Sequence, residues 1–252
     1  MAHRDQIVSY LDDLLDAGAY PDMTPNGLQV PGADTVEVVV TGVSPGLELF
    51  QAAAERGAQL VLTHHGLLGD FLPDHVTPVL KGRLKALFDA DLSLASYHLP
   101  LDAHAQVGNN ALICAELGLE RAEPFGSYKG TTLGFVGRSQ AGIPFAELRE
   151  RCARAFGTEP FAWEYGPEVV HSVGVVSGAA ASSLGEAVAG GLDAFLTGEP
   201  AEHVMLEARE AGIHFIAGSH YGTETFGVKR LGELLADRFG IRHEFVDMPN
   251  PV

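Results

Sequence analysis

The chain has 252 residues and a formal net charge of −17, with 33 aspartates and glutamates against 16 lysines and arginines. This length suits one large or two small α/β domains. The charge makes nucleic acid an unlikely partner, because affinity for a phosphate backbone depends on clustered lysine and arginine. No apolar run approaches the roughly 18 residues of a membrane span, and the charged N-terminus is unlike a signal or transit peptide. We therefore expect a cytoplasmic protein.

The two cysteines, Cys114 and Cys152, lie in helix-like surroundings and have no CxxC spacing. This pattern argues against a disulfide framework and against a thiolate metal site. Buried, inert thiols are expected.

The predicted elements alternate along the chain. The first 17 residues form an amphipathic helix, and a loop rich in proline and glycine follows, with a short extended piece at 28–30. Strands are then expected at 36–44, 59–65, 93–100, 126–140, 170–178, 193–200, 213–218 and 242–252, and helices at 46–58, 78–92, 105–119, 144–157, 183–192, 201–212 and 228–240. This alternation predicts an α/β fold with mainly parallel sheets and right-handed crossovers.

Two of these β-α-β units resemble each other. In each, a valine-rich strand ends at a turn with Ser and Gly, a helix follows, and an apolar strand ends in Thr. The spacing from Ser44 to Thr63 is 19 residues, and that from Ser177 to Thr197 is 20. We predict an internal duplication that gives two similar, intertwined α/β domains, near 1–125 and 126–252. The alternative explanation of this similarity is that any two β-α-β units look alike.

Ligands of open α/β sheets bind at the carboxyl ends of the strands. Polar or ionisable groups stand there in four segments: THHG at 63–66, YHLPLDAH at 97–104, TGEP at 197–200 and GSHYGTE at 218–224.

In the first segment, His64 and His65 are adjacent. Neighbouring side chains on a strand point to opposite faces, so both rings serve one site only if the chain turns there. Gly66 permits such a turn. The two imidazoles would then bind one ion or one ion each. The alternative is a pair of surface histidines.

In the second segment, His98 and Asp102 are four residues apart with Pro100 between them. Proline disfavours helical geometry in the residue before it, so we expect a strand end and loop. Asp102 would then be a site carboxylate or, alternatively, the N-cap of the following helix.

In the last segment, His220 and Glu224 share one helix face if a helix begins near Ser219 or Tyr221. A histidine and a carboxylate in this arrangement can hold a divalent ion. The alternatives are a histidine satisfied in the core and a glutamate that merely favours a helix N-terminus. Glu199, in TGEP, starts a predicted helix and could support the site from behind the ligands.

Taken together, these segments supply histidines and carboxylates without thiolate, a set that suits zinc, iron or manganese. The donors exceed the needs of one four-coordinate ion. A pair of divalent ions about 3.5–4 Å apart, bridged by a carboxylate and by water, fits them better.

The motifs PNGLQV, THHG, HLPLDAH with GNN, LDAFLTGEP, GSHYGTE and DMPNP resemble the NIF-three-like dinuclear metal-binding family, whose members are often labelled GTP cyclohydrolase I type 2 homologues. The resemblance covers nearly the whole chain and is to the compact bacterial form without an inserted domain. It implies two similar intertwined α/β domains and a homo-oligomer, a hexameric ring.

The resemblance also implies a ligand set and a role for each residue. Glu224 would be the bridging carboxylate, and His98 an extra ligand, a partner of the ligands or a proton shuttle. The metal ligands implied by the family are His64, His65, Asp102, His220 and Glu224.

The function expected is a metal-dependent hydrolase that acts on a nucleotide-like small molecule through a metal-bridged water, since the family label refers to opening of the GTP purine ring. No guanine-reading motif accompanies it. The alternative is a non-catalytic protein that binds or delivers metal, or a ring scaffold.

Overall fold

The computed structural model describes all residues from 1 to 252, and they form two compact units. Unit 1 comprises Met1–Leu101 and Gly227–Met248, and unit 2 comprises Asp102–Phe226 and Pro249–Val252. The predicted boundary near residue 125 differs from this division. Residues before 125 belong to unit 2 because strand β7 (Glu120–Tyr128) pairs with the strand that follows it. No helix is long and apolar enough to cross a membrane.

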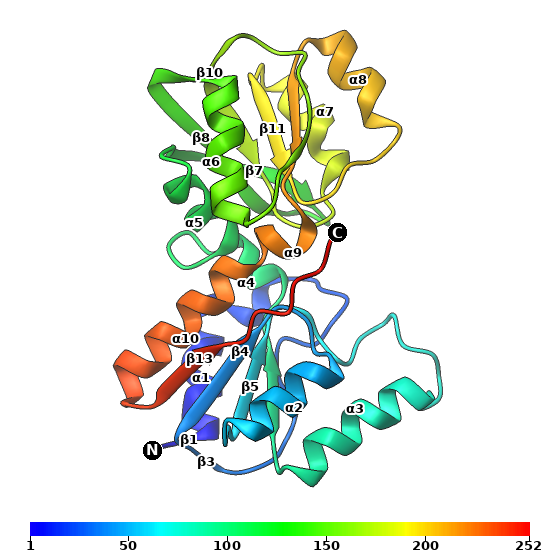
Figure 1. Cartoon of the computed structure of the whole chain (residues 1–252), viewed down its shortest axis with the longest axis vertical. Helices are drawn as coiled ribbons and strands as arrows, with labels where there is room; N and C mark the ends of the chain where they lie inside the picture. Colours follow the sequence, from blue (N-terminus) through cyan, green and yellow to red (C-terminus); the bar gives the residue numbers. More distant parts are fainter. The chain divides into compact units, whose positions relative to one another are not determined.

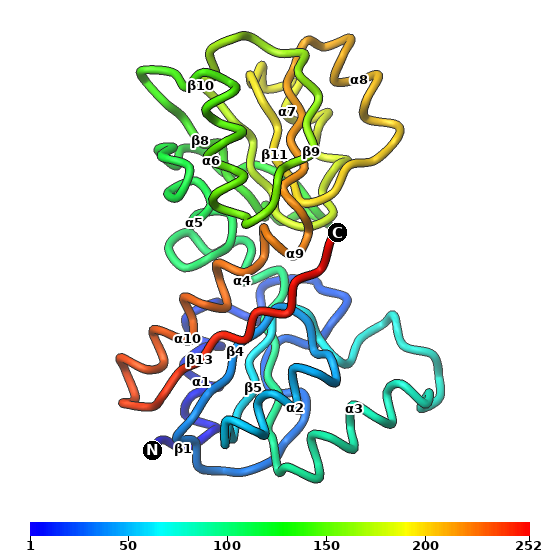
Figure 2. The backbone as a smooth tube through the Cα atoms, in the orientation of Figure 1, coloured from blue at the N-terminus to red at the C-terminus, as the bar shows by residue number.

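Unit 1 is built on a five-stranded sheet in the order β13-β4-β5-β6-β2. The first four strands are parallel, and β2 is antiparallel to β6. Figure 2 shows the last strand, β13, running beside β4 although the two are far apart in sequence. The strands of this sheet are β2 (Gly27–Val30), β4 (Val38–Gly42), β5 (Leu60–Thr63), β6 (Ser93–Ser96) and β13 (Arg242–Phe245), and the short strands β1 (Ala2–His3) and β3 (Thr35–Val36) pair separately.

The helices of unit 1 lie over this sheet (Figure 1), and the apolar side chains of their inner faces are buried. On α1, Ile7, Leu11 and Leu15 are buried, as their helical spacing predicts, and each such side chain contributes about 1.5–3 kcal/mol. One apolar cluster joins Phe50 of α2 and Leu87 of α3 to the sheet. The helices are α1 (Arg4–Leu15), α2 (Leu47–Glu55), α3 (Pro78–Asp89) and α10 (Thr225–Phe239), with a 3₁₀ turn, η1, at Ala17–Ala19.

Unit 2 is built on a six-stranded sheet in the order β7-β8-β10-β11-β12-β9. Only β10, β11 and β12 are parallel to one another, so the prediction of a mainly parallel sheet is wrong for this unit. The physical reason is a hairpin between β7 and β8, whose turn places Lys129 and Gly130 at φ of 48° and 86°. The remaining strands are β8 (Thr131–Pro144), β9 (Phe161–Trp163), β10 (Val169–Val175), β11 (Ala194–Thr197) and β12 (His214–Ala217).

Both sheets are therefore mixed, in an α/β protein, and three parallel strands form the centre of the second one. The internal duplication stays a prediction. The helices of unit 2 are α5 (Asn109–Glu116), α6 (Phe145–Phe156), α7 (Leu184–Ala189), α8 (Val204–Ala211) and α9 (His220–Thr223), with a 3₁₀ turn, η2, at Ala181–Ser183; α4 (Leu99–Ala103) carries the chain from unit 1 into unit 2.

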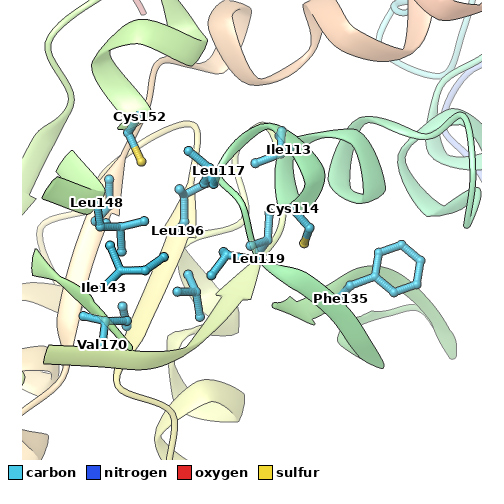
Figure 3. Packing of buried hydrophobic residues seen from close by; sticks show 14 of the residues in the cluster. Ile113, Cys114, Leu117, Leu119, Phe135, Ile143, Leu148, Cys152, Val170 and Leu196 are labelled. Carbon is cyan, nitrogen blue, oxygen red and sulfur yellow. The ribbon is translucent and has the colours of Figure 1, made fainter. Parts of the chain in front are cut away.

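Helices α5 and α6 pack over one face of the six-stranded sheet. Figure 3 shows Cys114 of α5 and Cys152 of α6 among leucine, isoleucine and valine side chains of this core. Burial raises the pKa of each thiol to about 12, so both stay protonated. The two cysteines are buried and unpaired to each other, as the sequence predicts.

His214 is buried at the start of β12 and held in its neutral form. Its ring stacks on Phe145 with the centroids 3.7 Å apart. Its Nδ1 accepts a hydrogen bond from the Gly166 amide at 3.1 Å, and its Nε2 donates to the Pro167 carbonyl at 2.7 Å. Burial lowers the pKa of this imidazole from 6.5 and outweighs the opposing effects of Pro167 and of nearby carboxylates.

Lowering the pH below 6.5 should therefore reduce the free energy of unfolding, because the unfolded chain takes up a proton that folded His214 resists. The loss begins near the unfolded pKa and levels off below the lowered folded pKa. In His214→Gln this contribution is absent. Urea unfolding of the metal-free variant should therefore show a smaller decrease in the free energy of unfolding between about pH 7 and about pH 5. The control His75→Gln removes an exposed histidine and should keep the wild-type slope. Equal slopes in all three proteins would contradict the assignment.

Candidate metal centre

His64 and His65 stand where strand β5 has ended and the chain is turning. Both of their amides donate to the Val43 carbonyl, at 3.1 and 2.9 Å. The Thr63 hydroxyl closes the turn by donating to the His65 carbonyl at 2.8 Å. The alternation of a strand is lost here, so the two rings lie close together, with centroids 5.1 Å apart. His64 is fully buried, which excludes the alternative of two surface histidines.

Gly66 is required at this turn for a reason other than backbone freedom. A Cβ atom on it would lie 1.7 Å from Thr24 Oγ1 and 2.7 Å from Gln29 Nε2. Gln29 in turn accepts hydrogen bonds from the Leu67 and Leu68 amides at 2.8 and 3.0 Å. The loop before β2 thus packs directly onto the histidine turn, and only a glycine leaves room for it.

A third histidine, His98, completes the cluster in unit 1. It follows β6, and its ring centroid lies 5.1 Å from that of His64 and 5.8 Å from that of His65. These three residues offer nitrogen atoms within 4.8 Å of one another. Trigonal or tetrahedral coordination of one ion by imidazole is compatible with such a spacing.

Each of these rings is anchored through Nδ1. His64 Nδ1 donates to the Tyr97 carbonyl at 3.1 Å, and His65 Nδ1 lies 2.9 Å from the Ser44 hydroxyl. His98 Nδ1 lies 2.8 Å from Asp22 Oδ1. Nε2 is therefore the atom that each ring presents for coordination, an arrangement typical of metal-binding histidines.

The Asp22 carboxylate was not identified from the sequence. Burial raises its pKa, but the hydrogen bond and charge of His98, with hydrogen bonds from Leu99 and Asn26, outweigh burial and lower the pKa to about 2. The same side chain lines a cavity of about 530 Å³ in unit 1, together with Asp12 and Asp70. Asp22 is therefore a charged group at neutral pH and separates this cavity from His98.

In unit 2, Asp102 is buried and its carboxylate is held on one side. Asn109 Nδ2 and the Ser177 hydroxyl both donate to Asp102 Oδ1, at 2.9 and 2.8 Å. Asn110 donates to the Asp102 carbonyl at 3.2 Å and accepts from the Ser177 amide at 2.7 Å. The GNN motif and Ser177 thus fix the orientation of the Asp102 carboxylate.

Two corrections concern this segment. The loop predicted around Pro100 is wrong, because residues Leu99–Ala103 form the short helix α4 with Pro100 in its first turn, where the missing N–H costs nothing. The capping role considered for Asp102 is also wrong, because α5 has Gly108 as its N-cap.

His220 is the first residue of α9, and it lies between two carboxylates. Its Nδ1 hydrogen-bonds Glu199, and its Nε2 lies 3.1 Å from Glu224 Oε1. Burial lowers the pKa of the His220 imidazole, but the hydrogen bonds and charges of Glu224 and Glu199 outweigh burial and raise it to about 9. The helix start that places His220 and Glu224 on one face is thus confirmed, and Glu199 is the predicted partner behind the histidine. The helix start predicted at Glu199 is wrong, because α8 begins at Val204.

The turn after β10 brings the two parts of the unit 2 cluster together. Ser177 binds Asp102, and its neighbour Gly178 lies directly beside Glu224, so that a Cβ atom there would be 2.6 Å from Glu224 Oε1. On the other side, Ser219 caps α9 by accepting from the Gly222 amide at 3.1 Å. Ser219 has a φ of 77°, a strained value for a residue with a side chain.

The chain matches the family model described as Duf34/NIF3 (NGG1p interacting factor 3) over residues 2–251. It belongs to the Duf34/NIF3 family. A GTP cyclohydrolase 1 type 2 homolog of Deinococcus radiodurans is 39% identical over 246 residues, which cover 98% of this chain and 93% of that protein. The protein of the same name from Escherichia coli is 36% identical, with 98% of each chain covered.

Two solved structures of similar proteins confirm the fold. The structure of protein ybgI, described as of unknown function, has a TM-score of 0.94 and 34% identity, with both chains fully covered. TTHA1606 from Thermus thermophilus has a TM-score of 0.89 and 36% identity, again over both whole chains. The resemblance seen in the sequence is thereby confirmed as membership of the Duf34/NIF3 family.

The ligands predicted for this Duf34/NIF3 protein are divided between the units. His64 and His65 belong to unit 1, where His98 joins them, and Asp102, His220 and Glu224 belong to unit 2. Each unit therefore presents imidazole and carboxylate side chains that are held in place by hydrogen bonds to neighbouring residues. This donor chemistry fits borderline divalent ions such as zinc, iron and manganese.

Gly178→Ala should weaken both folding and metal binding. The new Cβ would strain a φ of 67° and displace the Glu224 carboxylate. Overpacking of this kind costs about 1–3 kcal/mol. Gly57→Ala is the matched control, because Gly57 has the same φ of 67° but open space around it. Urea unfolding measures the change in stability of each variant. Zn(II) competition should show a loss of affinity in Gly178→Ala alone. Equal affinity in the two variants would contradict this role of Gly178.

Proposed function

We propose that this Duf34/NIF3 protein binds two divalent metal ions through the family's predicted ligands, with Glu224 as the bridging carboxylate. The observation that carries this proposal is the anchoring of these groups: in each unit, histidine Nδ1 atoms or a carboxylate oxygen are held by neighbouring residues, which fixes the orientation of the side chains proposed as ligands. The proposed ligands are His64, His65, Asp102, His220 and Glu224, with His98 as an additional ligand.

The charge around His220 supports a cation in unit 2. Glu199 and Glu224 together hold a proton on the imidazole well above its usual pKa. A metal ion at Nε2 would replace that proton as the positive charge beside Glu224, because metal binding requires the neutral ring. The two glutamates thus favour a positive charge at His220, whether it is a proton or a bound metal ion.

The activity we propose is hydrolysis of a nucleotide-like small molecule, in keeping with the name of the relatives. Two bound divalent ions would supply Lewis-acid polarisation and an activated water near neutral pH. The protein's part is to hold its donor groups in place through Tyr97, Asp22 and Glu199. The position of His98 beside His64 and His65 favours the role of ligand over that of proton shuttle.

A specific observation favours a second candidate, a metal-binding protein without catalysis. The cavity that Asp22 borders is also lined by Asp12 and Asp70, and none of its lining residues is a lysine or an arginine. Such a lining repels the phosphates of a nucleotide. The hexameric ring implied by the family stays a prediction for either candidate.

Elemental analysis should find about two divalent ions per chain in the native protein. Glu224→Gln should reduce this content to about one or none, because a neutral amide bridges two cations poorly. Glu210→Gln, an exposed position on α8, is the control and should keep the full content. With Mn(II) in both positions, electron paramagnetic resonance should show an exchange-coupled pair. Unchanged metal content in Glu224→Gln would contradict the proposed ligand set.

Hydrolysis of GTP, or of another member of a panel of nucleotides and phosphoesters, should require the metal and be abolished by a chelator. Substitution of the proposed bridge should lower the rate by at least about tenfold to a hundredfold, the usual effect of disturbing a metal site. Rates are compared for the metal-loaded protein, the chelated protein and Glu224→Gln. Exchangeable metal without turnover on the whole panel would exclude the hydrolase and support the second candidate.

A further inference from the structure

The loop between η1 and β2 places a buried carboxylate behind His98. The Asp22 side chain is 3% exposed and accepts four hydrogen bonds. One comes from the imidazole, His98 Nδ1, at 2.8 Å. The others come from the Leu99 amide at 3.1 Å, from Asn26 Nδ2 at 3.2 Å and from the Met23 amide at 2.7 Å.

These contacts determine which nitrogen of His98 carries the hydrogen. Asp22 Oδ1 is a charged acceptor, so His98 Nδ1 must donate to it, and in the neutral ring the lone pair is then on Nε2. The same loop also fixes the backbone of His98, because Asn26 Oδ1 accepts a hydrogen bond from the His98 amide at 2.8 Å. A carboxylate on the far nitrogen of an imidazole increases the basicity of the near one.

We propose that Asp22 is the positioning residue of His98: it holds the imidazole with the Nε2 lone pair directed toward His64 and His65, and strengthens that nitrogen as a metal donor. The inference rests on the proposed metal binding. It adds to the ligand set a residue that lies 76 positions from His98 in the sequence and belongs to no ligand motif.

A purely structural role for Asp22 is the competing explanation, because a carboxylate with four donors also ties the loop to α4. Asp193 provides the comparison within the same chain. Its Oδ2 accepts from the His171 amide at 2.8 Å, from the Ser172 amide at 2.9 Å and from the Ser172 hydroxyl at 3.0 Å. It makes the same kind of multiple contact, but with none of the predicted ligands.

The deciding experiment is a double-mutant cycle on the full chain, with Zn(II) as the probe and chelator competition as the measure of affinity. Asp22→Asn should weaken at least one of the bound ions by about tenfold to a hundredfold. In a His98→Ala background the same change should alter affinity by less than about twofold, because the residue acts through the imidazole. Asp193→Asn should lower the unfolding midpoint of the metal-free protein without changing Zn(II) affinity.

A loss of equal size in both backgrounds, or no loss in Asp22→Asn alone, would overturn the inference while leaving the metal site intact. Wild-type protein that binds no Zn(II) would instead overturn the proposed function. A second measurement needs no variant: long-range ¹H–¹⁵N spectra of the metal-free protein should show the hydrogen of neutral His98 on Nδ1. The opposite tautomer would refute the positioning role even if Asp22→Asn failed to fold.

Discussion

The hydrogen bond to histidine Nδ1 is the interaction that organises the site residues in both units. Four imidazoles are held in this way: His64 Nδ1 donates to a carbonyl, His98 and His220 Nδ1 donate to carboxylates, and His65 Nδ1 pairs with a hydroxyl. An imidazole without such a partner would rotate about its side-chain torsions and exchange its tautomers. With the partner in place, every ring presents the same atom, Nε2, and the partner sets how strongly that atom donates.

The order of the strands explains where these partners come from. The carbonyl that holds His64 belongs to Tyr97, directly after β6, and the hydroxyl that holds His65 belongs to Ser44, two residues after β4. Both strands flank β5 in the sheet. In unit 2, Glu199 follows β11 and His220 follows its neighbour β12. Parallel strands thus bring ligand and partner together at one edge, although they are distant in sequence.

The sequence predicts those features that depend on short-range patterns. Apolar runs and their helical or strand periods locate the central β-α-β units, and the polar residues after strand ends identify the histidines and carboxylates. The six-stranded sheet was less predictable, because the β7–β8 hairpin reverses the chain through Lys129 and Gly130, and the residues alone do not reveal which neighbour a strand will choose. Residues 227–248 return to unit 1 because β13 pairs with β4, and the sequence does not reveal this choice of neighbour either.

Long-range partners were beyond prediction for a related reason. Asp22 reaches His98 from a loop with no periodic pattern, and a buried carboxylate in such a loop looks like an exposed turn residue. The sequence predicts that Gly66 permits a turn, and its neighbours Thr24 and Gln29 show that it is also needed for close approach. Both effects arise only when segments far apart in the chain are folded against each other.

This dependence on distant partners links metal affinity to the stability of each unit. In the unfolded chain, His98 has no Asp22 behind it and His220 has no Glu199, so the rings lose both orientation and donor strength. A metal ion that binds the folded arrangement more tightly than the unfolded chain adds to the free energy of unfolding by mass action. The reverse also holds: a substitution that loosens a strand end would lower affinity without touching a ligand. The buried polar contacts of Asp22 and Asp102 offset the cost of burying these carboxylates, and in the folded chain they also preorganise the donor atoms.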